Sequence, residues 1–112
     1  MTALNRLLAQ KLWDEQGLNV VIPDLYTSID PGAFNNEWWD IPLTSIVIPD
    51  SVKSIGSESF RFNYLGNIII PDSVTSIGNR AFERNRLTSV EIGNGVTSIG
   101  EYAFAINRLT SV

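Results

Sequence analysis

The sequence predicts a repeat solenoid, a β-rich coil with two short strands in each turn. The first observation is an internal repeat, because related segments begin at residues 48, 70 and 92, which gives a period of 22 residues. A weaker copy begins at residue 22, and four extra residues separate it from the next copy. The second observation is that the apolar positions follow neither a helical stripe nor one long alternating strand. A 22-residue unit cannot bury its own apolar side chains, so equivalent turns must stack to close a core.

The repeat that begins at Leu87 indicates how one unit folds. Val90 and Ile92 alternate about a polar residue, which predicts a short strand. Val96 and Ile99 have two polar residues between them, which predicts a second extended segment. Each turn of the coil should therefore pair both segments in parallel with those of the neighbouring turn, roughly 4.8 Å away.

Turn residues separate these extended segments. Pro, Asp, Asn and Gly fill the first connection, where each suits a particular turn position. A second bend should follow the second segment, at Gly56, Gly78 and Gly100, with Asp30 in the first copy. Because Gly adopts φ above zero without steric cost, and Asp tolerates it, we expect a sharp bend with positive φ at these positions.

Stacked turns place equivalent residues in columns. One column is aromatic, and its members are Phe34, Phe60, Phe82 and Phe104. A second column contains Asn63, Asn85 and Asn107. Because buried polar groups need partners, we expect these Asn side chains to form a ladder that binds the backbone of the turns. A ligand-binding role for the three Asn residues is the alternative.

The N-terminal residues differ from the repeats and predict a capping helix over residues 2–16. Its apolar stripe consists of Leu4, Leu7, Leu8 and Leu12. Thr2 is the expected N-cap and Gly17 the expected end. Such a helix would cover the apolar end of the first turn, as repeat arrays require. A membrane-surface role is the alternative, but Arg6 and Lys11 are the only cations of this segment.

The chain is expected to form one domain, with the helical cap at residues 1–17 and four repeats plus the start of a fifth at 18–112. The segment LTSV at residues 87–90 returns at 109–112, where no continuation follows. We therefore expect a truncated fifth turn. Its open edge at 109–112 would favour self-association, because unpaired strand edges pair with other chains.

Written as LxxVxIxxxVxSIGxxAFxxNxLTSV, the repeat resembles the BspA-like (Treponema-type) leucine-rich repeats over roughly residues 18–112. The resemblance implies a curved, right-handed solenoid. Members are mostly surface or secreted proteins of microbes, with roles in adhesion and protein binding. Many carry Cys where this chain has Asn63, Asn85 and Asn107, so the chain looks like a variant with an Asn ladder.

Composition argues against most catalytic and metal-dependent classes. The 112 residues include no Cys and no His, which removes thiolate chemistry and the commonest metal ligand and general base. No catalytic motif stands out, so we expect no enzyme and no cofactor or metal; a carboxylate-based hydrolase is the remote alternative. The net charge of −4 disfavours nucleic acid, and no apolar run is long enough for a membrane span. No signal-peptide pattern is present, so a cell-surface or secreted location rests on the resemblance alone.

Candidate binding residues occupy outward positions of the predicted LxxVxI strands, which would line the concave face if the family geometry holds. They are Thr44, Ser45, Val47, Asn67, Ile69, Thr88, Ser89 and Glu91. One row across the turns contains Val47, Ile69 and Glu91. Its two apolar side chains would form part of a binding strip. The alternative is that they are ordinary strand formers on an exposed strand.

An insertion, NNEWWDIP at residues 35–42, adds a second candidate. Trp38 and Trp39 lie between two acids, and exposed Trp side chains suit protein hot spots and sugar stacking. Burial of one Trp against the helix, near Trp13, is the alternative.

One further column and one further group of residues carry charge, and in the group only Arg86 and Arg108 share a column. The first contains Asp24, Asp50, Asp72 and then Asn94, which would bind Ca²⁺ or, more simply, form turns. The second group consists of Arg80, Arg84, Arg86 and Arg108, a solvated face or the site of an anionic partner.

Together these features predict a non-catalytic module that binds another protein or a cell-surface macromolecule. A structural spacer within a longer protein is the alternative.

Overall fold

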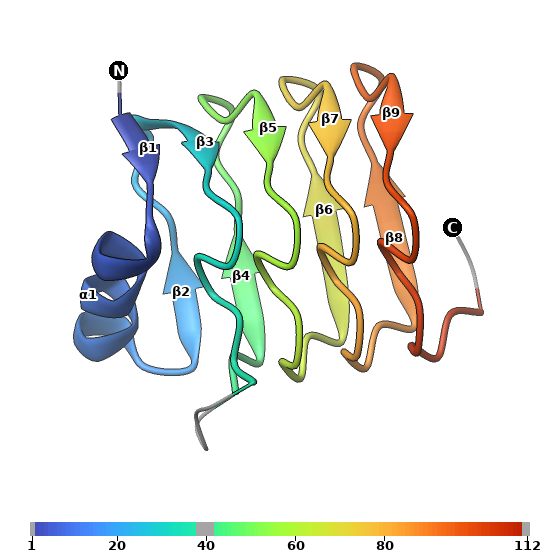
Figure 1. The fold of residues 1–112 in the computed structure, drawn as a ribbon, viewed down its shortest axis with the longest axis horizontal. Helices are drawn as coiled ribbons and strands as arrows, with labels where there is room; N and C mark the ends of the chain where they lie inside the picture. The colour runs from blue at the N-terminus through green and yellow to red at the C-terminus, as the bar shows by residue number, and fades with distance from the viewer. Residues whose placement is uncertain (1, 38–41, 111–112) are drawn as a thin grey trace.

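The computed structural model describes residues 2–37 and 42–110, and Figure 1 shows their turns standing side by side. Each repeat contributes two short strands, and the N-terminal segment contributes a strand and a helix. In chain order the elements are β1 (Thr2–Leu4), α1 (Arg6–Gln16), β2 (Asn19–Val21), β3 (Tyr26–Ile29), β4 (Ser45–Val47), β5 (Ser54–Ile55), β6 (Asn67–Ile70), β7 (Ser76–Ile77), β8 (Ser89–Ile92) and β9 (Ser98–Ile99).

All strand pairs are parallel, and the strands form two sides of the coil. One side is a five-stranded sheet in the order β1-β3-β5-β7-β9. On the other side β2 pairs with β4 and β6 pairs with β8, and β4 lies beside β6 (Figure 1). The register follows the repeat, because Ser54 pairs with Ser76 and Ser76 with Ser98. Equivalent residues of successive repeats are therefore neighbours in space.

The core lies between the two sides and contains a stack of aromatic rings. Phe34, Phe60, Phe82 and Phe104 lie with successive ring centroids 5.3, 5.1 and 5.3 Å apart and with interplanar angles of 9° or less. Trp13 of α1 continues this column, since its ring centroid lies 5.9 Å from that of Phe34. Aromatic side chains bury large apolar areas, so this column provides a large part of the core.

The N-terminal segment differs from the prediction of a helix over residues 2–16. Residues 2–4 form β1, which pairs with β3, so the expected Thr2 N-cap is wrong. The helix begins after Asn5, whose Oδ1 accepts a hydrogen bond from the Leu8 backbone N–H at 2.9 Å. It ends at Gly17, as expected, with φ of 74°. Residues 2–4 form a strand rather than the first turn of the helix because three residues can add to an existing sheet edge without an alternating apolar pattern of their own.

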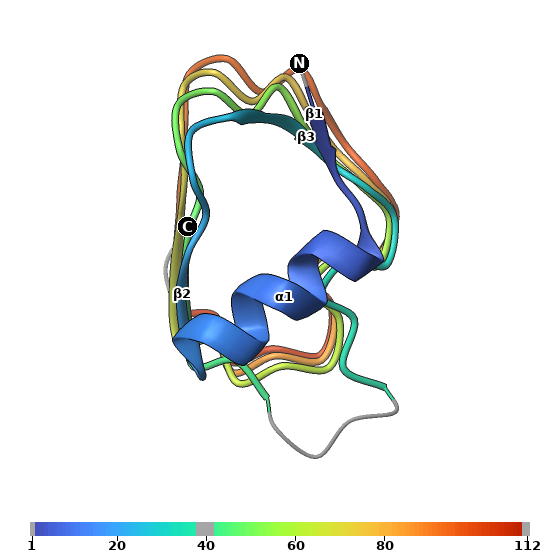
Figure 2. The ribbon, with the colours of Figure 1, turned by 90° about the vertical axis from the view of Figure 1, so that its left-hand side faces the viewer.

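The predicted apolar stripe of the helix is also partly wrong. Leu7 is 78% exposed, and Leu4 belongs to β1. The buried face consists instead of Ala9, Leu12 and Trp13. Figure 2 shows α1 lying across the end of the coil.

Arg6, in the first turn of α1, ties the helix to the first repeat. Its Nη1 donates to the carbonyl oxygens of Gly32 and Asn35 at 3.1 and 2.6 Å. Burial lowers the pKa of this guanidinium from its ordinary value. Within residues 2–37 and 42–110, no helix has the length and apolarity needed to cross a bilayer.

The expectation of positive φ at Gly56, Gly78, Gly100 and Asp30 is wrong, because φ is positive at Gly17 and Gly32 but at none of these four residues. Close packing between turns explains the three glycines instead. A Cβ on Gly56 would lie 2.5 Å from the backbone N of Pro31 in the preceding repeat. No side chain fits at that distance, so these glycines allow one turn to approach the next.

Positive φ occurs instead at residues with side chains, in two columns. The residues are Glu58, Arg80 and Tyr102, with φ of 58° each, and Phe62, Arg84 and Ile106, with φ between 55° and 63°. Non-glycine residues adopt this conformation at a cost, which the surrounding hydrogen bonds must offset.

Candidate functional site

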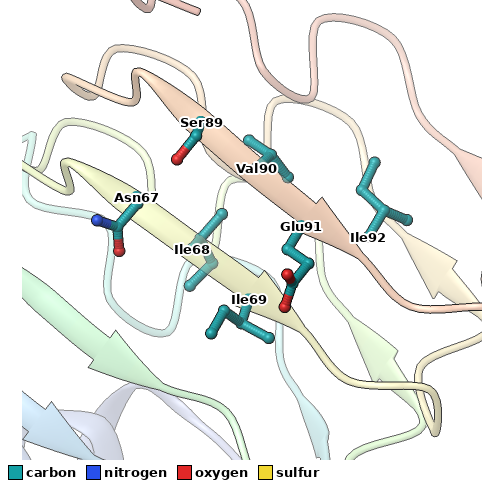
Figure 3. Close-up of a pocket in the computed structure, with 7 residues that line it drawn as sticks. All are labelled: Asn67, Ile68, Ile69, Ser89, Val90, Glu91 and Ile92. Carbon is teal, nitrogen blue, oxygen red and sulfur yellow. The ribbon is translucent and has the colours of Figure 1, made fainter. Parts of the chain in front are cut away.

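The outward residues of β4, β6 and β8 form one continuous surface, which we call the strand face. Figure 3 shows its hollow between β6 and β8, lined by residues 67–69 and 89–92. In each strand the side chains alternate, so Ile68 and Val90 are buried while Ile69 and Glu91 are exposed. Figure 3 shows that the exposed pair projects from the same side of the two strands.

The strand face carries a row of exposed apolar residues. Val47 is 53% exposed and Ile69 63% exposed. Val21 of β2 extends the row, since it is 56% exposed and pairs with Val47. Glu91, the partner of Ile69, ends the row. We call Val21, Val47 and Ile69 the apolar row.

Val21 was missed from the sequence because the first repeat is the weakest copy. Its offset of 26 residues from Val47 is the signal that would have identified it.

Polar residues flank the apolar row. Asn67 is exposed and pairs in register with the half-buried Ser89. Thr44 Oγ1 and Ser45 Oγ both donate to Oδ1 of Asn19, at 2.9 and 2.8 Å.

Threonine hydroxyls at the start of the strand face also connect neighbouring turns. Thr88 Oγ1 donates to the Gly66 carbonyl at 3.3 Å, and Thr110 Oγ1 to the Thr88 carbonyl at 3.1 Å. Their carbonyl partners in the preceding turn orient these hydroxyls, whereas the Ile69 and Val47 side chains face solvent.

The asparagine column lies inside the coil, next to the phenylalanine stack. Asn85 Nδ2 donates to the carbonyls of Phe60 and Phe82 at 2.9 and 3.0 Å, and its Oδ1 accepts from the Leu65 N–H at 3.1 Å. Asn63 and Asn107 repeat this pattern one turn earlier and one turn later. Each amide thus satisfies backbone groups of two successive turns, which leaves no polar atom of Asn85 for a ligand.

A charged cluster of Arg61, Arg80 and Glu83 lies at the second and third repeats, and the sequence singled out only Arg80 of the three. Glu83 is buried, and its carboxylate accepts from Arg61 Nε at 2.5 Å and from Arg80 Nη1 at 2.9 Å. Arg61 and Glu83 are 22 residues apart, so they occupy the same repeat position in adjacent turns. This 22-residue spacing is the sequence signal from which the pair could have been predicted. The pair connects turns and does not line the strand face.

Several other sequence candidates belong to segments that the structure does not describe. Trp38 and Trp39 lie outside the described residues, as do residues 111 and 112 of the predicted open edge. Leu109 is half-buried, and the Thr110 N–H donates to the Thr88 carbonyl at 2.9 Å. Self-association through 109–112 therefore stays a prediction.

The column of Asp24, Asp50, Asp72 and Asn94 includes one interaction typical of turn residues. Asp72 Oδ1 accepts from the Asn94 backbone N–H at 2.8 Å. Over the described part of the chain, no group of three or more acidic side chains is close enough to hold a metal ion.

Parallel strands stacked at a 22-residue period, with an Asn amide connecting successive turns, define a repeat protein of the leucine-rich type. Comparison with protein families matches residues 27–112 to the BspA type leucine rich repeat region, described as six copies of the repeat. The chain belongs to this family. Its members are typically non-catalytic repeat modules. Comparisons with curated proteins and with solved structures found no significant match.

Proposed function

We propose that the chain is a non-catalytic recognition module that binds another protein or a cell-surface macromolecule, in adhesion or scaffolding. The apolar row is the observation that carries this proposal. Three β-branched side chains, each more than half exposed, lie in one line across β2, β4 and β6. Such a line exposes apolar area to water, and a partner that covers it gains the hydrophobic free energy of that area.

The surroundings of the row favour a protein partner. Polar side chains of Asn67 and Ser89 on one flank supply hydrogen-bonding groups at the rim, as in protein interfaces. Glu91 and the net charge of −4 oppose a nucleic acid. The absence of His and Cys from the sequence, and the family's typical lack of catalysis, support a binding role over a hydrolase.

The proposed test begins with a library of displayed peptides and small domains, selected against the immobilised chain. Affinities of the selected binders are then measured for the wild type and for Val47→Glu and Ile69→Glu. Each substitution should weaken binding by about tenfold or more, because it buries a carboxylate under the partner. Leu7→Glu is the matched control, since Leu7 is an exposed apolar residue on α1, and it should change the affinity by less than about twofold.

Trp39→Ala tests whether the insertion takes part. If Ile69→Glu and Leu7→Glu have equal effects, the strand face is not the site. If no binder is selected, the spacer role replaces recognition.

We further propose that the repeats form the curved, right-handed solenoid of the family and that α1 acts as its cap. The buried face of α1 and the contact of Trp13 with Phe34 support the capping role. Without α1, the first ring of the phenylalanine column would face water.

A further inference from the structure

A second surface is formed by the segments that directly precede β6 and β8 and by the equivalent segment one repeat later. Three segments, residues 62–64, 84–86 and 106–108, stack there and line a shallow pocket. In each segment the central residue is a ladder Asn, which points inward. The residues on either side of each Asn therefore project outward. We call Phe62, Tyr64, Arg84, Arg86, Ile106 and Arg108 the arginine–aromatic patch.

The backbone of this patch is held in place from within. Asn63, Asn85 and Asn107 bind carbonyls of their own turn and of the preceding turn at distances of 2.9 to 3.1 Å. The residue before each Asn has positive φ, so the chain turns sharply there. The outward side chains thus start from fixed positions, which lowers the entropy lost when a ligand binds.

Aromatic rings orient two of the arginines. The Arg86 guanidinium carbon lies 3.6 Å from the centroid of the Tyr64 ring, and that of Arg84 lies 5.4 Å from the Phe62 centroid. A guanidinium stacked on a ring keeps its N–H groups at the edge free to bind a carboxylate in bidentate fashion. These arginines are prepared for an anionic group.

The positive charge of the patch is not neutralised within the described part of the chain. Arg84, Arg86 and Arg108 are exposed and make no ion pair with a carboxylate among residues 2–37 and 42–110. The nearby carboxylate of Glu83 is already bound by Arg61 and Arg80. A chain of net charge −4 therefore presents a local cationic surface.

We infer that the arginine–aromatic patch binds a short acidic peptide segment of a partner protein, one that also carries aromatic or aliphatic residues. Carboxylates would pair with Arg84, Arg86 and Arg108, while exposed Ile106 and Tyr64 would contact the apolar residues. A long polyanion fits less well, because beyond about one Debye length of 8–10 Å it meets an acidic molecule. This site is separate from the apolar row, so it stands or falls independently of the proposed function.

The test uses the full chain and a fluorescein-labelled peptide in which pairs of Glu and Asp alternate with Phe. Its counterpart carries Gln and Asn in place of the acids. Fluorescence anisotropy at about 0.1 M salt should give an affinity for the acidic peptide at least about tenfold above that of the amide peptide. Arg86→Glu and, separately, Arg108→Glu should each lower the affinity for the acidic peptide by about tenfold. Thermal unfolding of each variant checks that the fold is retained.

Lys53→Glu is the matched control, because it makes the same charge change at an exposed cation before β5, outside the patch. It should alter the affinity by less than about twofold. Equal binding of the two peptides, or an equal loss with Lys53→Glu, overturns the inference. A heparin oligosaccharide that binds more tightly than the acidic peptide also overturns it, since the patch would then be a general polyanion site. Ile69→Glu should leave peptide binding unchanged, which separates this result from the test of the strand face.

Discussion

Removal of one ladder amide should destabilise the whole coil, and Asn85→Ala is the sharpest form of that change. Asn85 is buried, and its side chain makes hydrogen bonds to backbone groups of two turns, among them the Leu65 N–H and the carbonyls of Phe60 and Phe82. The Leu65 N–H would lose the Oδ1 acceptor in a site closed to water, at a cost of about 2 kcal/mol. The carbonyls of Phe60 and Phe82 would each keep one bond, from the neighbouring ladder asparagine, and lose another. The free energy of unfolding should therefore fall by about 3 kcal/mol in total.

Urea unfolding monitored by circular dichroism measures this change. Asn94→Ala is the control, because Asn94 is an exposed asparagine outside the ladder, and its effect should stay within about 0.5 kcal/mol. Asn107→Ala removes the same bonds from a half-buried site, where water can replace the amide, so about 1 kcal/mol is expected. The reasoning is refuted if Asn85→Ala costs no more than Asn94→Ala.

Three further substitutions test the packing between turns, each by urea unfolding. Trp13→Ala should cost about 3–5 kcal/mol, because it uncovers the end of the phenylalanine column, whereas Leu7→Ala on the exposed side of α1 should stay within about 0.5; similar values for the two would contradict the capping role. Gly78→Ala should cost about 1–3 kcal/mol, since its Cβ meets the backbone of the preceding repeat, while Gly66→Ala has open space and should be nearly neutral. Glu83→Ala should cost about 2–3 kcal/mol, because two arginines lose their shared carboxylate; a neutral result would show that the pair adds no stability.

Most of the fold could be predicted from the 22-residue period of the sequence. Because equivalent residues lie 22 apart, the alignment alone places Phe60 above Phe82 and Asn63 above Asn85, and the structure has them as neighbours. Parallel pairing preserves this order, since each strand meets its counterpart in the next turn. The columns could be predicted because residues one period apart in the sequence become neighbours in space when the repeats stack.

Features that depend on local backbone geometry were harder to predict. Positive φ at Glu58 and Arg80 has no residue-type signal, because neither residue favours that conformation. The recurrence of Gly at positions 56 and 78, one period apart, suggested a bend, but close approach of the neighbouring turn is the actual reason. β1 was missed because its three residues carry no strand pattern and gain their order from β3.

The candidate site was predictable only in part. Val47 and Ile69 follow from strand alternation, whereas Val21 lies in a diverged copy with a longer offset. The orientation of Arg86 over Tyr64 depends on how two adjacent turns stack, which spacing does not specify.

The most direct test of the recognition proposal is a methyl-resolved NMR titration with a binder selected from the displayed library. With Ile and Val methyl groups labelled, the account predicts saturable shifts at Val21, Val47 and Ile69. Ile99 and Ile106 are also exposed but lie outside the apolar row, and their signals should stay in place. Shifts at Ile99 or Ile106, with none in the apolar row, would contradict the account.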